Sequence, residues 1–342
     1  MKQRWIRRGA RAVTRRLVAA AVIAATATAC GAGRGAPGSG SAVNGAGPVP
    51  VGTVTAAGAP AAGAPAADAP AAAATRARGV GAPGVHGPPQ GVAWQYQLQP
   101  ASGPFARSGG IDVTICDPPL TGGPCVRPRV FDIDLYGPDG VTPDSSAVRA
   151  IRRAGGYPIC YVDAGTWENW RPDAGRFPHA VLGRPNGWPG ERWLDIRQTG
   201  ILLPLIEARV AKCASAGFQG VEYDNVDGYT NDTGFPLTAA EQLRYDRALA
   251  VIAHRHGLAA GLKNDYDQVA ELLGWFDFTI DEQCAQYAEC PRLRPFVAAG
   301  KAVFDVEYAS PAARLCGEAT AAGADAITKR PDLLALPWRP CR

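Results

Sequence analysis

Short apolar runs alternate with amphipathic segments from residue 91 to the end of the chain. Each run has the length of a β-strand and is bounded by glycine, proline or polar residues, whereas the segments between the runs place apolar residues at helical spacing. The pattern predicts eight strands, at Val92–Leu98, Arg129–Tyr136, Tyr157–Asp163, Phe218–Asn225, Leu258–Asn264, Phe276–Glu282, Lys301–Tyr308 and Ala324–Lys329.

Helices are predicted at Pro143–Ala154, Ile201–Ala216, Thr238–His256, Gln268–Trp275, Arg292–Ala299 and Ala312–Ala322. The strongest is Thr238–His256, because Thr238 and Glu241 form a capping-box pattern and Gly257 follows its end. Eight strands alternating with helices predict an α/β fold, a (β/α)8 barrel of the TIM type. A doubly wound open sheet is the alternative, although no glycine-rich phosphate turn follows the first strand.

The N-terminal 90 residues differ in composition from the rest. Residues 1–30 combine seven Lys or Arg side chains with the apolar run Leu17–Ala29, which indicates an export signal too short to span a bilayer. The end of this signal resembles a lipoprotein processing site, with Cys30 as the lipid-modified residue; ordinary cleavage after Ala29 is the alternative. Residues 31–90 consist mainly of Ala, Gly and Pro and predict a disordered tether, and residues 91–342 form the folded domain.

The charge is unevenly placed along the chain. Residues 1–90 hold ten Lys or Arg and one acid, so residues 91–342 hold 25 basic and 30 acidic side chains, a net charge of −5. A net acidic domain argues against nucleic acid as a partner and is compatible with a cationic ligand.

Nine cysteines support export. Apart from Cys30, the even number of eight predicts disulfides in a protein that reaches an oxidising compartment. The spacing suits loops closed by Cys116–Cys125 and Cys284–Cys290, which would leave Cys160, Cys213, Cys316 and Cys341, but the connectivity stays open. A zinc site is the alternative, and it is disfavoured because the chain contains no C-x-x-C and no histidine beside a cysteine.

Acidic residues gather where the predicted strands end. The stretch 217–229 passes from an apolar run to Glu222, Asp224 and Asp227, and carboxylates recur at the ends of several other strands. In a barrel these ends share one face, which is where active sites form. Aromatic residues nearby, such as Trp167 and Tyr229, favour a carbohydrate ligand; core packing is the simpler interpretation of any one of them. Two carboxyl groups flanking a bond are what glycoside hydrolysis requires.

Other chemistries lack their signatures. No G-x-S-x-G motif is present for a serine hydrolase, and His254 and His256 are spaced to lie on different sides of a helix. The stretch 223–234 fails the calcium-loop pattern of an EF-hand, because its first position is Tyr223 and its twelfth is Gly234. We therefore expect neither a cofactor nor a metal.

Several motifs in order resemble the endo-α-1,4-polygalactosaminidase family of glycoside hydrolases. They are ICYVDAGTWE at 159–168, WLDIR at 193–197, GVEYDNVDGY at 220–229, GLKN at 261–264 and DEQC at 281–284, followed by Cys290. The resemblance extends from about Trp94 to Lys329 and implies a TIM barrel that cleaves α-1,4-linked, galactosamine-rich polymers of microbial exopolysaccharide.

The resemblance also implies a site. It places the catalytic carboxylates at Asp224 and Glu282, with Glu282 as general acid/base and Asp224 as its partner, more plausibly the nucleophile. It places substrate-binding residues at Asp134, Asp163, Trp167, Glu222, Asp227, Tyr229, Lys263, Asn264 and Glu307.

We therefore expect an exported or surface-tethered enzyme that acts as a monomer on a cationic amino-sugar polymer. Two alternatives remain at this point. One is a barrel glycosidase for another amino-sugar polymer, and the other is a non-catalytic sugar-binding surface protein.

Overall fold

The computed structural model describes residues 84–342 except 102–104 and 106–107. The predicted export signal, Cys30 and nearly all of the predicted tether lie outside the described residues, so those expectations stay predictions. Within the described part, none of the helices combines the length and the apolar character needed to cross a membrane.

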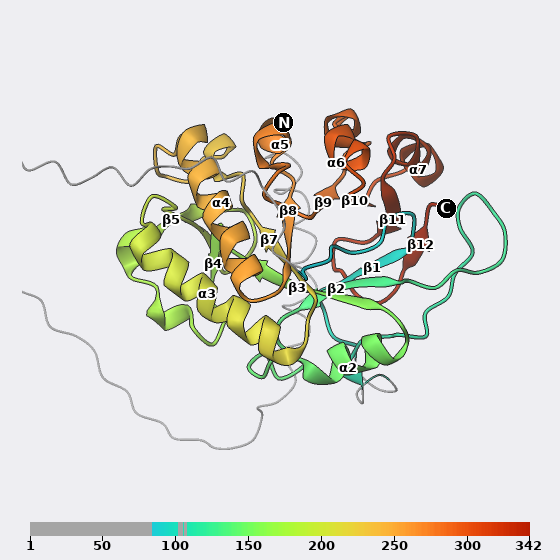
Figure 1. Cartoon of the computed structure of the whole chain (residues 1–342), viewed down its shortest axis with the longest axis horizontal. Helices are drawn as coiled ribbons and strands as arrows, with labels where there is room; N and C mark the ends of the chain where they lie inside the picture. Colours follow the sequence, from blue (N-terminus) through green and yellow to red (C-terminus); the bar gives the residue numbers. More distant parts are fainter. Residues whose placement is uncertain (1–83, 102–104, 106–107) are drawn as a thin grey trace, which may run out of the picture. The chain divides into compact units, whose positions relative to one another are not determined.

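Eight parallel strands form the centre of the fold (Figure 1). They are β1 (Trp94–Gln97), β2 (Val130–Asp134), β3 (Tyr157–Asp163), β7 (Gly220–Asp224), β8 (Ala259–Lys263), β9 (Phe278–Glu282), β10 (Ala302–Glu307) and β11 (Asp325–Lys329). Each pairs in parallel with the next, and β12 (Trp338–Pro340) adds an antiparallel strand to β11.

Side chains complete the barrel where no strand ladder of the described residues joins β11 to β1. Lys329 Nζ donates a hydrogen bond to Gln95 Oε1 at 2.6 Å. Trp338 Nε1, on β12, donates to the backbone oxygen of Trp94 at 2.7 Å. The parallel sheet is therefore nearly closed, and the predicted α/β barrel is confirmed.

Helices cover the outside of the sheet in Figure 1. They are α2 (Ser145–Arg153), α3 (Thr199–Ala216), α4 (Ala239–Arg255), α5 (Val269–Leu272), α6 (Arg294–Ala298) and α7 (Ala312–Ala321). The predicted capping box of α4 is present, since Thr238 accepts from the Glu241 backbone and Glu241 accepts in return. Helices α5 and α6 are shorter than predicted. Each follows a 3₁₀ turn, at Tyr266–Gln268 and Cys290–Leu293, and α5 ends at Leu272, before the predicted Trp275.

Alternation along the strands separates two apolar layers. One cluster lies inside the barrel and includes Trp94, Phe278 and Phe304, whereas residues of the other strand face, such as Val221 and Leu262, pack under the helices. The wide ring of Phe278 requires space, and Gly261 provides it: a Cβ there would lie 2.4 Å from that ring.

An insertion between β3 and α3 was not predicted. The segment 166–194 forms a separate antiparallel sheet of β4 (Thr166–Glu168), β5 (Leu182–Pro185) and β6 (Glu191–Leu194), in the order β4-β6-β5. The sequence gives little sign of it, because its strands are short and rich in Gly, Pro and Arg. The described residues also contain no α-helix between β1 and β2, where a loop closed by a disulfide takes its place (Figure 1).

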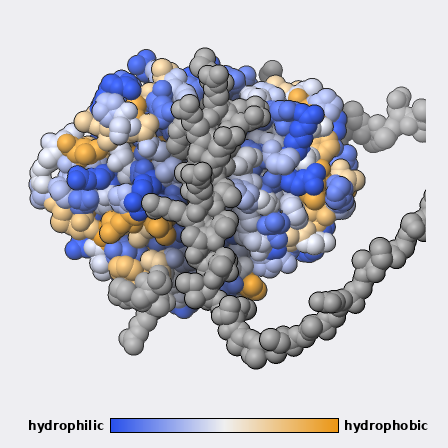
Figure 2. Space-filling model, turned by 180° about the vertical axis from the view of Figure 1, so that it is seen from behind, coloured by the Kyte–Doolittle hydropathy of each residue, from blue (hydrophilic) through white to orange (hydrophobic). Residues whose placement is uncertain are grey.

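Four disulfides connect the eight cysteines of the described part. They join Cys116 to Cys125, Cys160 to Cys213, Cys284 to Cys290, and Cys316 to Cys341. The two loop closures suggested by spacing are confirmed, and the remaining four cysteines pair within barrel and terminal elements. The surface shown in Figure 2 is a mixture of hydrophilic residues and small hydrophobic patches.

Candidate active site

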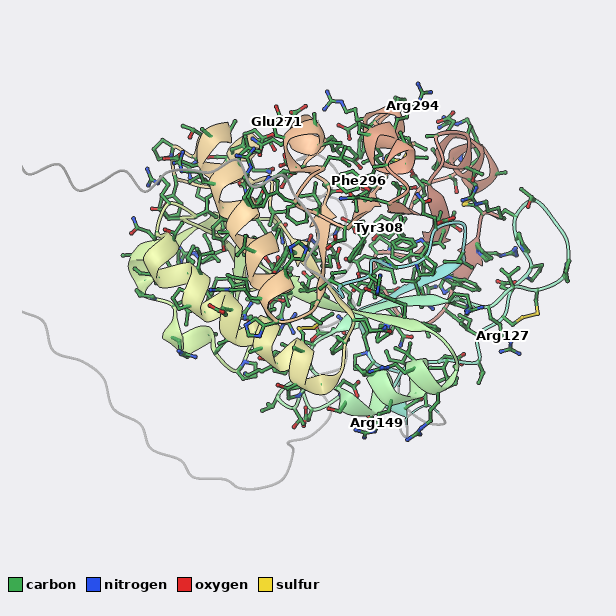
Figure 3. The ribbon with its side chains drawn as sticks, in the orientation of Figure 1. Arg127, Arg149, Glu271, Arg294, Phe296 and Tyr308 are labelled. Carbon is green, nitrogen blue, oxygen red and sulfur yellow. A yellow bond between two sulfur atoms is a disulfide. The ribbon has the colours of Figure 1, made fainter. Side chains whose placement is uncertain are left out.

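A cleft of about 320 Å3 opens at the carboxyl ends of the strands. The barrel interior supplies Tyr96, Asp134, Tyr161, Asp224, Lys263, Glu282 and Tyr308 to its lining. The inserted sheet and its loops supply Glu168, Trp170, Arg171, Asn186, Trp188, Glu191 and Trp193. In Figure 3, Tyr308 lies in the middle of the barrel, whereas the labelled Arg127, Arg149, Glu271 and Arg294 lie at its periphery.

Lys263 occupies the centre of the charged groups. Its side chain is 2% exposed, and Nζ lies 2.9 Å from Asp224 Oδ1, 3.3 Å from Glu222 Oε1 and 3.7 Å from Glu282 Oε2. These carboxylates raise the pKa of Lys263 well above its ordinary value, against the opposing effect of burial. A permanently charged ammonium group therefore lies between the two predicted catalytic carboxylates.

Of the two predicted catalytic carboxylates, Asp224 accepts from more hydrogen-bond donors than Glu282. Besides Lys263, the Tyr161 hydroxyl donates to its Oδ2 at 2.8 Å, and Asn225 Nδ2 lies 3.4 Å from the same atom. Donors at both oxygens stabilise the ionised carboxylate.

Glu282 is more open to the cleft. Its side chain is 31% exposed, and it accepts one hydrogen bond, from the Tyr308 hydroxyl to Oε1 at 2.5 Å. Its backbone N–H donates to Asn264 Oδ1 at 3.0 Å, so the loop after β8 fixes the end of β9. A partly exposed carboxyl group with a single hydroxyl donor suits a role in proton exchange with a substrate.

The backbone turns in the same way after each of these strands. Asn225, Asn264 and Gln283 directly follow Asp224, Lys263 and Glu282, and all three have positive φ, at 60°, 52° and 63°. Asparagine tolerates this left-handed conformation better than most residues. The turns allow the chain to leave each strand while the preceding side chain stays aimed into the barrel.

A second layer of acids lies below the cleft floor. Glu222 and Asp132 are both fully buried next to each other, and Glu222 also accepts from the Tyr96 hydroxyl at 3.3 Å. Burial, followed by the charge of Glu222, raises the pKa of Asp132 well above its usual range. Burial raises the pKa of Glu222 to about 7, although Lys263 opposes the shift. Burial therefore favours the protonated forms of this pair.

The predicted site residues fall into two groups. Asp134, Asp224, Asp227, Lys263, Asn264 and Glu282 line the cleft. Asp163, Trp167, Glu222, Tyr229 and Glu307 are not part of its lining. Each of the second group has a contact of its own within the protein: the Tyr229 hydroxyl donates to Asp265, and Trp167 Nε1 donates to the Ala174 backbone at 3.0 Å.

Glu307 lies on the outer face of β10 because strand residues alternate and its neighbours Val306 and Tyr308 face the barrel interior and the cleft. Its Oε1 accepts from the backbone N–H of Ala285 at 2.7 Å and of Gln286 at 3.3 Å. Burial raises its pKa to about 7. Glu307 thus supports the loop after Glu282 rather than the cleft surface.

Asp163 also lies under the surface. It is fully buried and accepts from the Thr166 backbone at 2.7 Å and from Asn225 Nδ2 at 2.8 Å. Burial and the nearby Glu168 raise its pKa well above the usual range. It connects the start of the inserted sheet to the turn after Asp224.

Sequence reasoning missed most of the wall contributed by the inserted sheet. Arg171 is the main cation there, donating to Asp134 at 2.7 Å and to Glu168 at 2.6 Å. The acids raise the pKa of Arg171 further, against its burial. The W-P-G-E-R-W segment at 188–193, with two tryptophans flanking an acid, was the signal that could have indicated this wall.

Two groups of potential metal ligands occur among the described residues. In the first, Cys284 is bonded to Cys290 and so offers no thiolate beside Asp305 and Glu307. In the second, Asp163, Glu168 and Glu191 lie within 4.8 Å of one another, but Glu168 is neutralised by Arg171. Neither donor set calls for a metal in the chemistry described below.

Comparisons with known proteins show the family and support the fold. Residues 74–339 match the sequence profile of glycoside-hydrolase family GH114. Ega3 of Aspergillus fumigatus, solved in complex with galactosamine, has a TM-score of 0.62 and 31% identity, over 74% of this chain and 96% of that one. The glycoside hydrolase domain of PelA from Pseudomonas aeruginosa has a TM-score of 0.50 and 16% identity, over 74% and 98% of the two chains, which supports the fold alone. No curated protein matches the chain.

Proposed function

The chain belongs to glycoside-hydrolase family GH114, and we propose that it is an exported endo-acting enzyme that cleaves α-1,4-linked, galactosamine-rich polysaccharide. The family resemblance inferred from the motifs is confirmed, and the protein is a glycoside hydrolase. The single observation that carries the proposal is the pair Asp224 and Glu282, which both lie close to Lys263 in an open cleft.

The spacing of this pair is compatible with a double displacement. Lys263 Nζ lies 2.9 Å from Asp224 Oδ1 and 3.7 Å from Glu282 Oε2, so these two oxygens are at most 6.6 Å apart, the sum of the two distances. Retaining enzymes separate their carboxyl groups by about 5–5.5 Å, and inverting enzymes by about 6.5–9.5 Å. This bound concerns one oxygen of each carboxyl group and admits the retaining separation, so we propose retention of configuration from the role assigned to Asp224.

In the first step, Asp224 attacks the anomeric carbon as a carboxylate while Glu282 gives its proton to the departing glycosidic oxygen. The carbon–oxygen bond breaks and a glycosyl ester forms on Asp224. In the second step, Glu282 takes a proton from water, the water oxygen attacks the anomeric carbon, and Asp224 is released as a carboxylate. Both residues thus return to their starting states.

Lys263 has a defined part in this scheme. Its ammonium stabilises the Asp224 carboxylate before attack and after release, at 2.9 Å. Because Lys263 also lies 3.7 Å from Glu282, it favours the charged form that Glu282 adopts after protonating the leaving group. The Tyr308 hydroxyl supports the same state by donating to Glu282 Oε1.

The substrate class is supported by charge and by the comparison. The structurally similar Ega3 was solved with galactosamine, a sugar whose amine is protonated near neutral pH. The cleft lining of this chain includes four Asp, three Glu and only two Arg or Lys side chains. We therefore expect a cationic polymer to be favoured.

Export is supported by the four disulfides, because such bonds persist in oxidising compartments. We propose that the N-terminal signal directs the chain out of the cytoplasm and that lipid attachment at Cys30 would keep it at the membrane surface. Mass spectrometry of the mature N-terminus tests this: a diacylglyceryl group on Cys30 supports the anchor, and an unmodified N-terminus contradicts it.

The activity is tested by measuring new reducing ends on de-N-acetylated α-1,4-galactosamine polymer. We expect cleavage by the parent chain and loss of cleavage by Asp224→Asn and by Glu282→Gln, with unchanged circular dichroism. Asp267→Asn and Glu318→Gln are matched controls, because both acids form exposed ion pairs outside the cleft lining. Full activity of either cleft variant would contradict the assignment of the pair.

A further inference from the structure

The inserted sheet places two unusually exposed tryptophans on one wall of the cleft. Trp170 is 51% exposed and Trp188 is 39% exposed, and both line the cleft. Large aromatic rings are normally covered in folded proteins, and rings left open in a cleft provide flat faces for ligands. The C–H face of a sugar ring suits such a surface.

One turn positions these rings together with an acid. Asn186 Oδ1 accepts from the Trp188 backbone at 2.9 Å, and Asn186 Nδ2 donates to Glu191 Oε2. Gly190, at φ 90°, allows close approach of Trp170, since a Cβ there would lie 2.9 Å from the Trp170 ring. The wall is therefore ordered before any ligand arrives, which reduces the entropy cost of binding.

Glu191 differs from the two acids next to it. Asp163, Glu168 and Glu191 lie within 4.8 Å of one another. Glu168 forms ion pairs with Arg171 and Arg209, and Asp163 accepts hydrogen bonds from Thr166 and Asn225.

Within the described residues, by contrast, no Lys or Arg forms an ion pair with Glu191, and only its Oε2 accepts hydrogen bonds. Glu191 also lines the cleft. The other carboxylate oxygen, Oε1, is thus left for a ligand.

We propose that this wall is a sugar subsite in which Glu191 binds the ammonium group of an unacetylated 2-amino sugar whose ring rests on Trp170 and Trp188. This inference rests on the proposed function and makes it more specific, because it assigns selection against N-acetylated sugars to one residue. An acetamide carries no charge and cannot form the ion pair with Glu191.

The raised pKa of Glu191 is what an acid without a cationic partner should show. Burial, followed by the charge of Glu168, raises the pKa of Glu191 to about 8. Of the other charged groups that act on it, Asp224 raises the pKa further and Arg171 lowers it. At pH 7 Glu191 is thus mostly protonated, and pairing with an ammonium group displaces that proton. Binding of the amino sugar should release a proton at pH 7.

The test measures binding in the Glu282→Gln background, where no cleavage is expected. The probes are a fully de-N-acetylated α-1,4-galactosamine oligosaccharide and its fully N-acetylated counterpart, titrated by calorimetry in two buffers of different ionisation enthalpy. We expect Glu191→Gln to weaken binding of the de-N-acetylated probe roughly 10- to 100-fold, as for loss of a charge-assisted hydrogen bond. Its proton release should disappear, and its binding of the acetylated probe should change less than about 2-fold.

Two further variants separate the subsite from a general structural effect. Trp170→Ala and Trp188→Ala should weaken binding of both probes by similar factors, roughly 3- to 10-fold, because stacking on a sugar ring does not depend on whether its amine is acetylated. Glu271→Gln, at the periphery in Figure 3, should leave binding unchanged.

The outcomes are distinguishable from those of the proposed function. If the Glu282→Gln variant binds the de-N-acetylated probe through Glu191 but the unmodified chain cleaves no polymer, the subsite is supported and the proposed activity is contradicted. The subsite would be overturned if adding Glu191→Gln to the Glu282→Gln variant left the affinity for each probe unchanged. It would also be overturned if the Glu282→Gln variant did not bind the de-N-acetylated probe. A Ca²⁺ or Mn²⁺ titration that saturates only when Glu191 is present, with amino-sugar binding unchanged by Glu191→Gln, would also overturn it in favour of a metal site.

Discussion

The interior of the barrel has aromatic side chains at the amino ends of its strands and charged side chains at their carboxyl ends. The aromatic group consists of Trp94, Phe278 and Phe304. The ring centroid of Phe304 lies 5.1 Å from that of Trp94 and 6.4 Å from that of Phe278. The carboxyl end contains Lys263 among Asp224, Glu222 and Glu282. Strand β9 provides both, with Phe278 at its start and Glu282 at its end, so stability and chemistry are separated by only a few residues along this strand.

This difference predicts that substitutions at the two ends change different quantities. At the amino end they should lower the free energy of unfolding and leave the activity of folded molecules intact. At the carboxyl end they should lower activity first. Three experiments test the separation, from the largest expected effect to the smallest.

Phe278→Ala should have the largest effect, on stability. Removing a fully buried ring leaves a cavity among Trp94, Phe304 and Gly261, and such changes cost about 3–5 kcal/mol of unfolding free energy. Urea unfolding of the variant measures this cost, with Val251→Ala as the control at a 40% exposed apolar position. Activity per folded molecule should stay within about 2-fold of the parent; a larger loss would show that the two ends are coupled.

Lys263→Met should lower kcat/KM by roughly 10²- to 10³-fold, comparable to loss of one preorganised electrostatic group. The physical reason is that Asp224, Glu222 and Glu282 then share the site without a cation. Reducing-end assays measure the effect.

Lys301→Met is the matched control at the other end of the barrel. Its Nζ donates to the Leu273 backbone at 2.7 Å, and it lies outside the cleft lining. This control should lower stability and keep kcat/KM; a parent-like Lys263→Met would contradict the central role of Lys263.

The smallest effect concerns pH. Burial raises the pKa values of Glu222 and Glu307 to about 7, and those of Glu191 and Asp265 to about 8. Between pH 5 and 7 the folded chain therefore binds more protons than the unfolded chain, in which these acids ionise near their ordinary pKa.

Stability should consequently fall as the pH rises across this window, with a decrease of several degrees in Tm, on the order expected for a few such groups. Scanning calorimetry measures it. The window ends at pH 7 because burial lowers the pKa of Lys329 to about 7, and that group acts in the opposite direction above this pH. Glu307→Gln should flatten the decrease, and a Tm that rises from pH 5 to 7 would contradict the assignment of buried protons to the carboxyl end.

The strands of the barrel could be predicted from the sequence because each is a short apolar run between clear turns. Tyr157–Asp163 was predicted to the residue, and the helix at Thr238–His256 differs by one residue at each end. The inserted sheet could not be predicted, since β5 (Leu182–Pro185) contains glycine and proline and has no apolar alternation.

The site was predictable in part for a similar reason. Strand ends identify which residues reach the catalytic face, and Asp224, Lys263 and Glu282 lie there. Which side of a strand an end residue occupies depends on register, and this distinguishes Glu307, behind β10, from Tyr308 in the cleft. Glu191 and Trp188 belong to the inserted sheet and its loops, so strand ends of the barrel could not reveal them.

The disulfides have a consequence for how the chain matures. Eight cysteines can pair in 105 ways. Here each bonds to the next cysteine along the chain, across separations of 9, 53, 6 and 25 residues. When a chain enters an oxidising compartment with its N-terminus first, the second cysteine of each pair can therefore bond to the one that arrived just before it. Correct pairing then follows the order of arrival, and oxidation alone can complete it without reshuffling by an isomerase.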